Sequence, residues 1–175
     1  MRNRLQPVFS PSAAAHTAAL AQSAGNAEAV DVLARTLWGE ARYETLRSLE
    51  AVAAVIRNRA IRTRPDDCPG DDQAIVATCL RDPLFSCWNA DAPNRSQLLT
   101  ISSADPVFAT CLRIARRAVN GALADPTGGA TRYHARSVFP RWASGWSPCA
   151  EIGNLLFYPE PEAPGTCPSP LSAPG

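Results

Sequence analysis

Apolar side chains recur every three or four positions in four separate segments of this chain. That spacing places them on one face of a helix, because an α-helix completes a turn in about 3.6 residues. The pattern predicts helices over residues 27–38, 45–61, 72–80 and 105–121. In the last of these, Asp105 can act as N-cap, Pro106 occupies the first helical position and Gly121 lies near the end. Most of the core should therefore be buried between helices.

Two shorter segments have the composition of β-strands. Residues 130–138 follow a turn signal and are rich in β-branched and aromatic residues, and residues 152–158 form a second apolar stretch. With the helices they predict an α+β fold, mainly α, with a small β element beside a helical body.

The length of 175 residues and the 46% hydrophobic content fit one domain, expected over residues 27–158. Residues 1–26 are expected to form a flexible leader. Their start, MRNR, resembles the beginning of an export signal, but Pro7 and Pro11 interrupt the apolar stretch that a signal needs. Residues 159–175 contain six prolines and are expected to form an extended tail.

The net charge of +1 provides no basic surface for nucleic acid, so no such partner is expected. No segment reaches the ~20 consecutive apolar residues of a transmembrane helix. The six cysteines are many for a cytosolic domain, and their even number predicts up to three disulfides of open connectivity in an oxidising compartment: Cys68, Cys79, Cys87, Cys111, Cys149 and Cys167. With no Cys-x-x-Cys spacing and two histidines, neither a metal centre nor a cofactor is expected.

Glu40 stands between Gly39 and Ala41, directly after an apolar helical stretch. Apolar neighbours raise the pKa of a carboxylic acid, and such an acid can donate its proton to the leaving oxygen of a glycosidic bond. Gly39 is expected to end the first helix, which would place Glu40 where two helices meet. The alternative role for Glu40 is a solvated charge at a helix end.

Five sequence blocks support the first role when they are taken together: LARTLWGEARYE, LEAVAAVIRNRA, FSCWN, DPTGGATRYHARSVFPRWA and the terminal IGN–FY segment. In this order they resemble the spore-cortex-lytic cell wall hydrolases (SleB/CwlJ-like), from Val32 to Tyr158. The resemblance implies a lysozyme-like helical body that cleaves the glycan strands of peptidoglycan at the MurNAc-GlcNAc β-1,4 bond, with Glu40 as general acid. Action as a monomer in the periplasm, cell envelope or extracellular space is expected, and the compartment follows from the cysteines.

The blocks also supply candidate substrate-binding residues, namely Glu44, Phe85, Trp88, Asn89, Thr131, Tyr133 and His134. Along a strand Thr131 and Tyr133 share one face and His134 lies on the other, which favours the first two as the substrate side. Two positions depart from the family pattern: Tyr43 replaces a Gly, and Leu155 replaces a His.

The sequence leaves open the mechanism of cleavage and two alternative functions. Glu44 is either a second catalytic carboxylate, as two-carboxylate hydrolysis requires, or a charge at a helix N-terminus. A lytic transglycosylase needs only Glu40, because the muramic acid 6-hydroxyl acts as nucleophile, and the single prominent Glu and the resemblance favour this route over hydrolysis by water. A thiol peptidase or amidase using Cys87 and His134 is the alternative enzyme class, and a wall-binding module without activity is the alternative to catalysis.

Overall fold

The computed structural model describes residues 13–64, 70–81 and 85–160 of the chain. Its helices are α1 (Ala13–Ala41), α2 (Leu46–Thr63), α3 (Asp71–Arg81), α4 (Arg95–Thr100) and α5 (Pro106–Val119), with short 3₁₀ turns η1 (Ser86–Trp88) and η2 (Arg141–Ala143). The strands are β1 (Arg132–Ala135), β2 (Ala150–Ile152) and β3 (Leu155–Tyr158). The expected α+β fold, mainly α, is confirmed.

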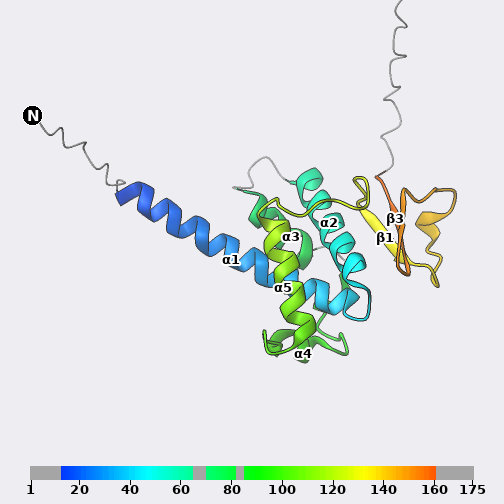
Figure 1. The fold of residues 1–175 in the computed structure, drawn as a ribbon, viewed down its shortest axis with the longest axis horizontal. Helices are drawn as coiled ribbons and strands as arrows, with labels where there is room; N and C mark the ends of the chain where they lie inside the picture. The colour runs from blue at the N-terminus through cyan, green and yellow to red at the C-terminus, as the bar shows by residue number, and fades with distance from the viewer. Residues whose placement is uncertain (1–12, 65–69, 82–84, 161–175) are drawn as a thin grey trace, which may run out of the picture.

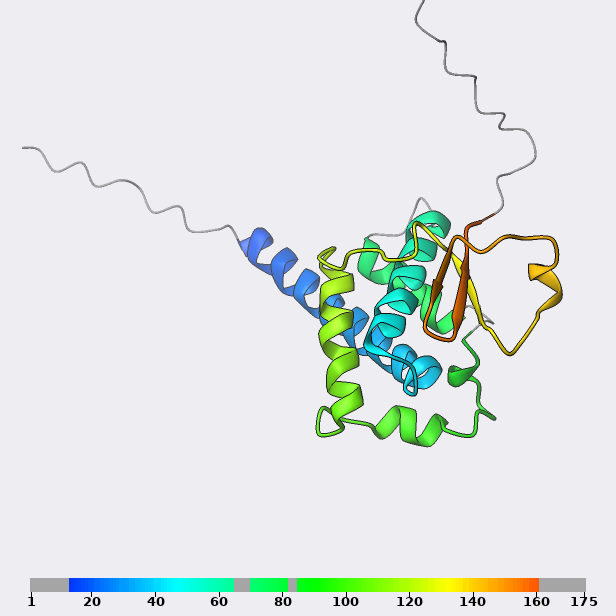
Figure 2. The same cartoon turned by 45° about the vertical axis from the view of Figure 1, so that its right-hand side comes forward.

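The C-terminal half of α1 forms the centre of the helical body, where it packs against α3 and α5, and α2 packs against the same two helices. The small sheet lies on one side of this body, next to α2, while the N-terminal half of α1 extends away from it (Figures 1 and 2). The largest fully buried side chains come from both parts and include Leu33, Leu37, Val52, Ile56 and Phe157. None of the described helices is both long enough and sufficiently apolar to span a membrane.

Two predicted helix starts are confirmed by their caps. Thr45 Oγ1 accepts a hydrogen bond from the backbone N–H of Ser48 at 3.2 Å, and Asp105 Oδ1 accepts one from the N–H of Phe108 at 2.7 Å. These bonds satisfy N–H groups that the first turn of a helix leaves unpaired.

The first helix differs from its prediction at both ends. It begins at Ala13, so residues 13–26 are helical where a flexible leader was expected, and it ends at Ala41, so Gly39 does not stop it. A glycine inside a helix costs only about 1 kcal/mol relative to alanine, which tertiary packing readily offsets. Glu40 consequently lies in the last helical turn. Residues 1–12 and most of the predicted tail, 161–175, lie outside the described residues.

The second predicted strand, residues 152–158, is confirmed over Leu155–Tyr158, whereas its first residues belong to the end of β2 and to the hairpin turn. Gly153 has a φ of +59° and starts the two-residue turn between β2 and β3, a conformation that glycine adopts without strain. The sheet order is β1-β3-β2, all antiparallel, with Tyr133 opposite Phe157. Leu155 is buried in β3, so the position where the family pattern has a His belongs to the core here.

The disulfide prediction is wrong for the cysteines that the structure describes. Cys79, Cys87, Cys111 and Cys149 are all thiols. Cys79 and Cys111 are fully buried in the helical core, where they pack as small apolar side chains, and burial raises the pKa of Cys111 to about 12. Cys68 and Cys167 lie outside the described residues. The cysteine count therefore no longer argues for an oxidising compartment.

Candidate functional site

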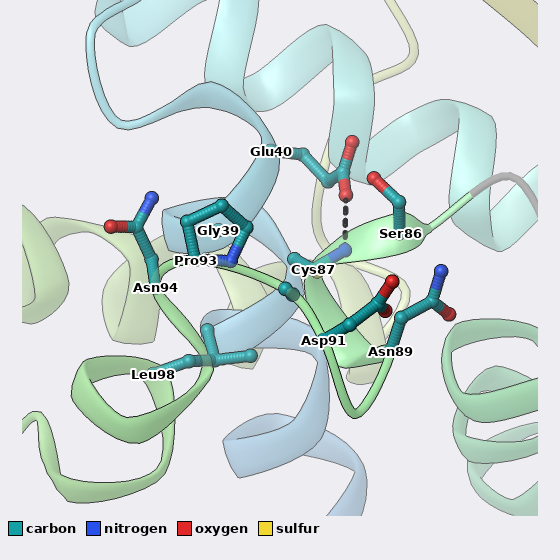
Figure 3. Close-up of a pocket in the computed structure, with 10 residues that line it drawn as sticks. Gly39, Glu40, Ser86, Cys87, Asn89, Asp91, Pro93, Asn94 and Leu98 are labelled. Carbon is teal, nitrogen blue, oxygen red and sulfur yellow. Dashed lines mark hydrogen bonds between the residues drawn. The ribbon is translucent and has the colours of Figure 1, made fainter.

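Glu40 lies between two cavities and contributes to the wall of both. The larger, of about 330 Å³, has a polar wall from the segment that follows α3, and Leu98 of α4 adds an apolar surface. The polar side chains in that wall are Ser86, Asn89, Asp91 and Asn94. Figure 3 shows the Glu40 carboxyl group directed toward Ser86 and Cys87.

The smaller cavity, of about 180 Å³, lies between the helical body and the sheet. Its wall combines Val55 and Arg59 of α2 with Phe85, and with four residues of the strand region: Thr131, Arg132, Tyr133 and Trp142. Glu40 thus belongs to the walls of both cavities: one is polar, and the other is more apolar, with two arginine side chains in its wall. A chain-like molecule running past Glu40 would have space on both sides of the carboxyl group.

The surroundings of Glu40 favour its protonated form. Burial raises the pKa of the carboxyl group, and hydrogen bonds from the thiol and the backbone N–H of Cys87 lower it in part, with the N–H to Oε1 distance at 3.3 Å. The net shift is upward. Glu40 therefore keeps its proton to a higher pH than a solvated Glu does, as a general acid requires.

Gly39 allows the segment with Cys87 to approach Glu40. A Cβ atom at position 39 would lie 2.7 Å from Cys87 Cβ and 2.9 Å from Cys87 Sγ, closer than such atoms come in proteins. The absence of a side chain thus lets η1 pack directly on the last turn of α1. This contact brings the Cys87 N–H within reach of the Glu40 carboxylate.

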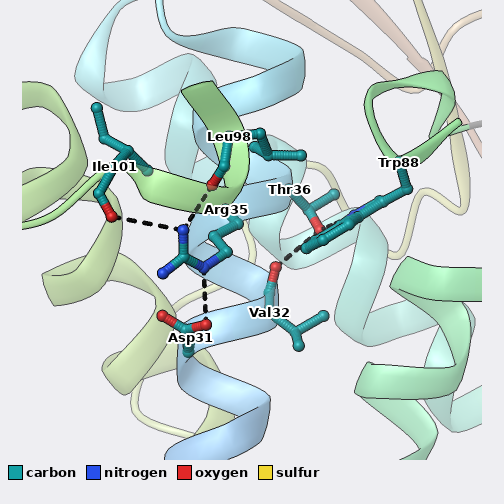
Figure 4. A network of polar contacts seen from close by, with 7 residues as sticks. All are labelled: Asp31, Val32, Arg35, Thr36, Trp88, Leu98 and Ile101. Atoms are coloured by element: carbon teal, nitrogen blue, oxygen red, sulfur yellow. Dashed lines mark hydrogen bonds and ion pairs between the residues drawn. The ribbon is translucent and has the colours of Figure 1, made fainter. Parts of the chain in front are cut away.

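Residues of α1 that precede Gly39 also hold the segment from η1 to α4 in place (Figure 4). Trp88 Nε1 donates to Thr36 Oγ1 at 3.0 Å. Arg35 donates from Nη1 to the carbonyl oxygens of Leu98, at 2.5 Å, and of Ile101, at 3.4 Å, while its Nε pairs with Asp31 at 2.8 Å. The segment that forms the polar wall of the larger cavity is therefore attached to α1, the helix that carries Glu40.

The structure brings four of the predicted substrate-binding residues to the cavities beside Glu40. Asn89 lines the larger cavity, and Phe85, Thr131 and Tyr133 line the smaller one. The ring of Tyr133 lies 5.9 Å from that of Phe157, and burial, followed by the nearby charge of Glu40, raises the pKa of its hydroxyl. Tyr133 thus presents a neutral phenol to the cavity.

The other three predicted substrate-binding residues, Glu44, Trp88 and His134, line neither cavity. Trp88 is partly buried against the core and its Nε1 donates to Thr36 Oγ1, so it attaches the segment that lines the larger cavity to α1. Glu44 Oε2 lies 3.5 Å from the position a Cβ would take at Gly153, at the turn of the hairpin. Tyr43 has no positive φ, so replacing the family's Gly strains nothing there, and its side chain is 88% exposed.

His134 is buried on the other face of β1, as the alternation of a strand predicts. Its Nε2 pairs with the hydroxyl of Tyr158 and its Nδ1 with the carbonyl of Ala135, both at 2.9 Å. Cys87 instead pairs with Glu40, and burial and the Glu40 charge raise the pKa of its thiol well above the ordinary value. A thiol nucleophile needs the opposite shift and a histidine base beside it, so the arrangement does not suit a Cys87–His134 enzyme.

Among the residues of the cavity walls that sequence reasoning missed are the charged or aromatic residues Arg59, Asp91, Arg132 and Trp142. Arg132 and Trp142 fall within the quoted block DPTGGATRYHARSVFPRWA, so the block marked the region without marking these positions. Arg59 looked like the solvated end of a helix, although it is 9% exposed. Asp91 lies in a polar loop that has no distinguishing pattern.

Comparisons with known proteins agree with this architecture. A family model described as Cell Wall Hydrolase matches residues 43–158, a segment that starts just after Glu40. The crystal structure of the catalytic domain of the Bacillus cereus SleB protein superposes with a TM-score of 0.55 at 22% sequence identity, over 75% of this chain and 89% of that one. No curated protein matches the chain. At this identity the structural likeness shows a shared fold.

Proposed function

Because this chain belongs to the cell wall hydrolase family, we propose that it cleaves the glycan strands of peptidoglycan, at the MurNAc-GlcNAc β-1,4 bond, with Glu40 as general acid. The observation that carries this proposal is a half-buried carboxyl group with a raised pKa, set between two cavities. Sugar rings on either side of the scissile bond would occupy the two cavities. The leaving oxygen would then lie beside Glu40.

Lytic transglycosylation is the mechanism that uses Glu40 alone. Glu40 gives its proton to the leaving O4 of GlcNAc while the bond from C1 of MurNAc to that oxygen breaks. The muramic acid O6 bonds to C1, and the Glu40 carboxylate accepts the proton of the 6-hydroxyl. The product is a 1,6-anhydro end, no water is consumed, and Glu40 returns to its protonated form.

Water hydrolysis is the second candidate, and Asp91 is the observation that favours it. Asp91 is a second carboxylate in the larger cavity, on a different segment from Glu40. In an inverting glycosidase such a carboxylate activates a water molecule on the face of the sugar opposite the acid. Glu44, the second carboxylate suggested by the sequence, lies outside both cavities.

We propose that this protein works in the cell envelope or outside the cell, and its membership of a cell wall hydrolase family supports this. The proposed partners are therefore the glycan strands themselves, with no cofactor required, since proton transfer by carboxyl groups supplies the chemistry. We propose that a monomer suffices, because both cavities are formed within one chain.

Mass spectrometry of digested peptidoglycan tests the function and separates the two mechanisms. Transglycosylation yields 1,6-anhydromuramic ends, and hydrolysis yields reducing ends that take up one oxygen from H₂¹⁸O. We expect anhydro ends from the wild-type protein, and reducing ends would transfer the assignment to hydrolysis with Asp91 as base. Release of peptides from intact glycan strands would contradict the glycosidase function.

Cys87 offers a test through the pH dependence of cleavage. Its thiol hydrogen bond lowers the pKa of Glu40, so Cys87→Ala should raise that pKa further. A general acid works below its pKa, and the rate is lost as the pH rises through it. We therefore expect the basic limb of the kcat/KM profile of Cys87→Ala to move to higher pH, as measured by release of soluble glycan.

Cys87→Ser is the matched control, because a hydroxyl keeps a hydrogen-bond donor at the same place. Its basic limb should stay closer to that of the wild type, with turnover retained in both variants. A complete loss of turnover in folded Cys87→Ser protein would instead mean that the thiol takes part in the chemistry.

A further inference from the structure

Arg132, in the wall of the smaller cavity, makes only one of the two hydrogen bonds that one edge of its guanidinium group can donate. Its Nη2 donates to Glu160 Oε1 at 3.2 Å, whereas Nε is buried without a hydrogen-bond partner among the described residues. The N–H groups of Nε and Nη2 point from the same edge of the planar guanidinium, the edge that can bind a carboxylate through two parallel hydrogen bonds. One of those two bonds is missing here.

Two tryptophan rings hold this guanidinium in place. Its central carbon lies 5.7 Å from the ring centres of both Trp142 and Trp146, and Trp142 in turn contacts the ring of Tyr158 edge-on. A cation placed over aromatic rings keeps its orientation, and the edge of Arg132 that carries Nε and Nη2 faces Glu160. Arg132 is therefore oriented to donate two hydrogen bonds to a carboxylate, of which Glu160 accepts one.

Glu160 is bound to this position through both carboxylate oxygens, but to two different donors. Its Oε1 accepts from Arg132, and its Oε2 accepts from Thr131 Oγ1 at 2.9 Å. Partial burial opposes ionisation, but the hydrogen bonds from Thr131 and Arg132 and the charges of Arg132 and Arg59 lower the pKa of Glu160. The three residues thus create a site that stabilises a carboxylate.

That site adjoins the proposed catalytic acid. Arg59, Thr131 and Arg132 line the same cavity as Glu40, so a carboxylate seated there would belong to a group close to the cleaved bond. A neutral sugar offers hydroxyl groups to Arg132 but no negative charge to replace that of Glu160. The glycan strand of peptidoglycan carries carboxylates of the required kind, either on the lactyl group of muramic acid or on the stem peptides.

We propose that Arg132, Thr131 and Arg59 form a carboxylate-binding subsite, which Glu160 occupies in the uncomplexed protein and which a substrate carboxylate takes over. The proposal rests on the glycan-cleaving function proposed above and adds to it a preference for anionic strands. Glu160 acts in it as an internal competitor. If Glu160 instead only fixes the chain after β3, its removal would lower stability and would leave substrate affinity unchanged.

The test compares three substrates: glycan strands stripped of peptides, the same strands with their lactyl carboxylates converted to amides, and strands that keep their stem peptides. Arg132→Gln should raise KM about tenfold on carboxylate-bearing strands, with kcat within about twofold, and should raise KM much less on amidated strands. Glu160→Gln should lower KM on carboxylate-bearing strands severalfold. The stripped and peptide-bearing strands identify which carboxylate is bound.

Arg136→Gln is the matched control, because Arg136 forms an exposed ion pair with Glu151 and lines neither cavity. It should behave like the wild type on all three substrates. Arg132→Lys keeps the charge but not the two-bond edge, so it should lose most of the preference even if Arg132→Gln folds poorly. Equal rises in KM on carboxylated and amidated strands, or an unchanged KM in Glu160→Gln, would overturn the proposal.

Calorimetric titration of the same strands into Glu40→Gln protein separates this proposal from the function itself. If the wild-type protein releases no glycan, the proposed function fails, while the binding data still decide the subsite. Tighter binding of carboxylated than of amidated strands, lost in the Glu40→Gln/Arg132→Gln double variant, supports the subsite. Equal binding of both kinds of strand contradicts it.

Discussion

Replacing Glu40 with glutamine is expected to remove nearly all glycan cleavage and to leave the fold intact. The amide has almost the same shape as the acid but cannot deliver a proton, and general acid catalysis contributes ~10²–10⁴-fold to a rate. Because the half-buried carboxyl group gains nothing from ionisation in this environment, its replacement should leave the melting temperature similar or slightly raised. The measurements are kcat on purified glycan strands and a thermal melt of the same sample.

Glu44→Gln is the control for this experiment, since Glu44 lines neither cavity, and it should cleave at close to the wild-type rate. Asp91→Asn reports on the mechanism, because only hydrolysis needs a second carboxylate in the larger cavity. Activity of Glu40→Gln within about threefold of wild type would show that Glu40 is not the acid. A large loss in Glu44→Gln would bring back the two-carboxylate interpretation of the sequence.

The second large effect is expected from Gly39→Ala, a change of one methyl group. Alanine favours the helix itself by about 1 kcal/mol, but its Cβ would overlap Cys87 Cβ and Sγ. The η1 segment must then move away from α1, and the hydrogen bond from Cys87 N–H to Glu40 is lost. Because displacements of about 1 Å in an active site cost on the order of 100-fold in rate, we expect a loss of kcat of that size.

Gly25→Ala provides a matched control on the same helix. A Cβ at position 25 meets nothing within 4 Å, so the substitution should change only helix propensity, with stability raised by up to about 1 kcal/mol and activity unchanged. If Gly39→Ala were as active as Gly25→Ala, the close contact between α1 and Cys87 would have no part in positioning Glu40.

Local sequence signals predicted the parts of the fold that depend on neighbouring residues. Asp105 caps its helix as predicted and Thr45 caps the helix predicted to start there, because a side-chain oxygen and an N–H three residues later are enough to define the start. The end of α1 was mispredicted at Gly39. A glycine is needed at this position because Cys87, forty-eight residues later in the chain, packs directly against it. The local sequence carries no signal of that contact.

In the candidate site, too, local sequence predicted some positions, while others depend on tertiary contacts. Strand alternation separates Tyr133, which lines the smaller cavity, from His134 on the other face, but Arg132, which alternation would put with His134, lines the cavity as well. By contrast, Trp88 was expected to meet substrate, and its indole N–H is used by Thr36 of α1. Arg132 and Asp91 acquire their positions only when the sheet and the loop after η1 meet Glu40, so their roles depend on tertiary contacts.

The contacts of α1 with the segment from η1 to α4 follow the helical repeat. Arg35 and Gly39 are separated by four residues, as are Thr36 and Glu40, so these four positions share one face of the helix. Inserting or deleting one residue between Thr36 and Glu40 would rotate the carboxyl group by about 100° relative to the contacts above it. The spacing of this stretch is therefore under stricter constraint than most of its side chains: a length change there removes the site even when every residue type is kept.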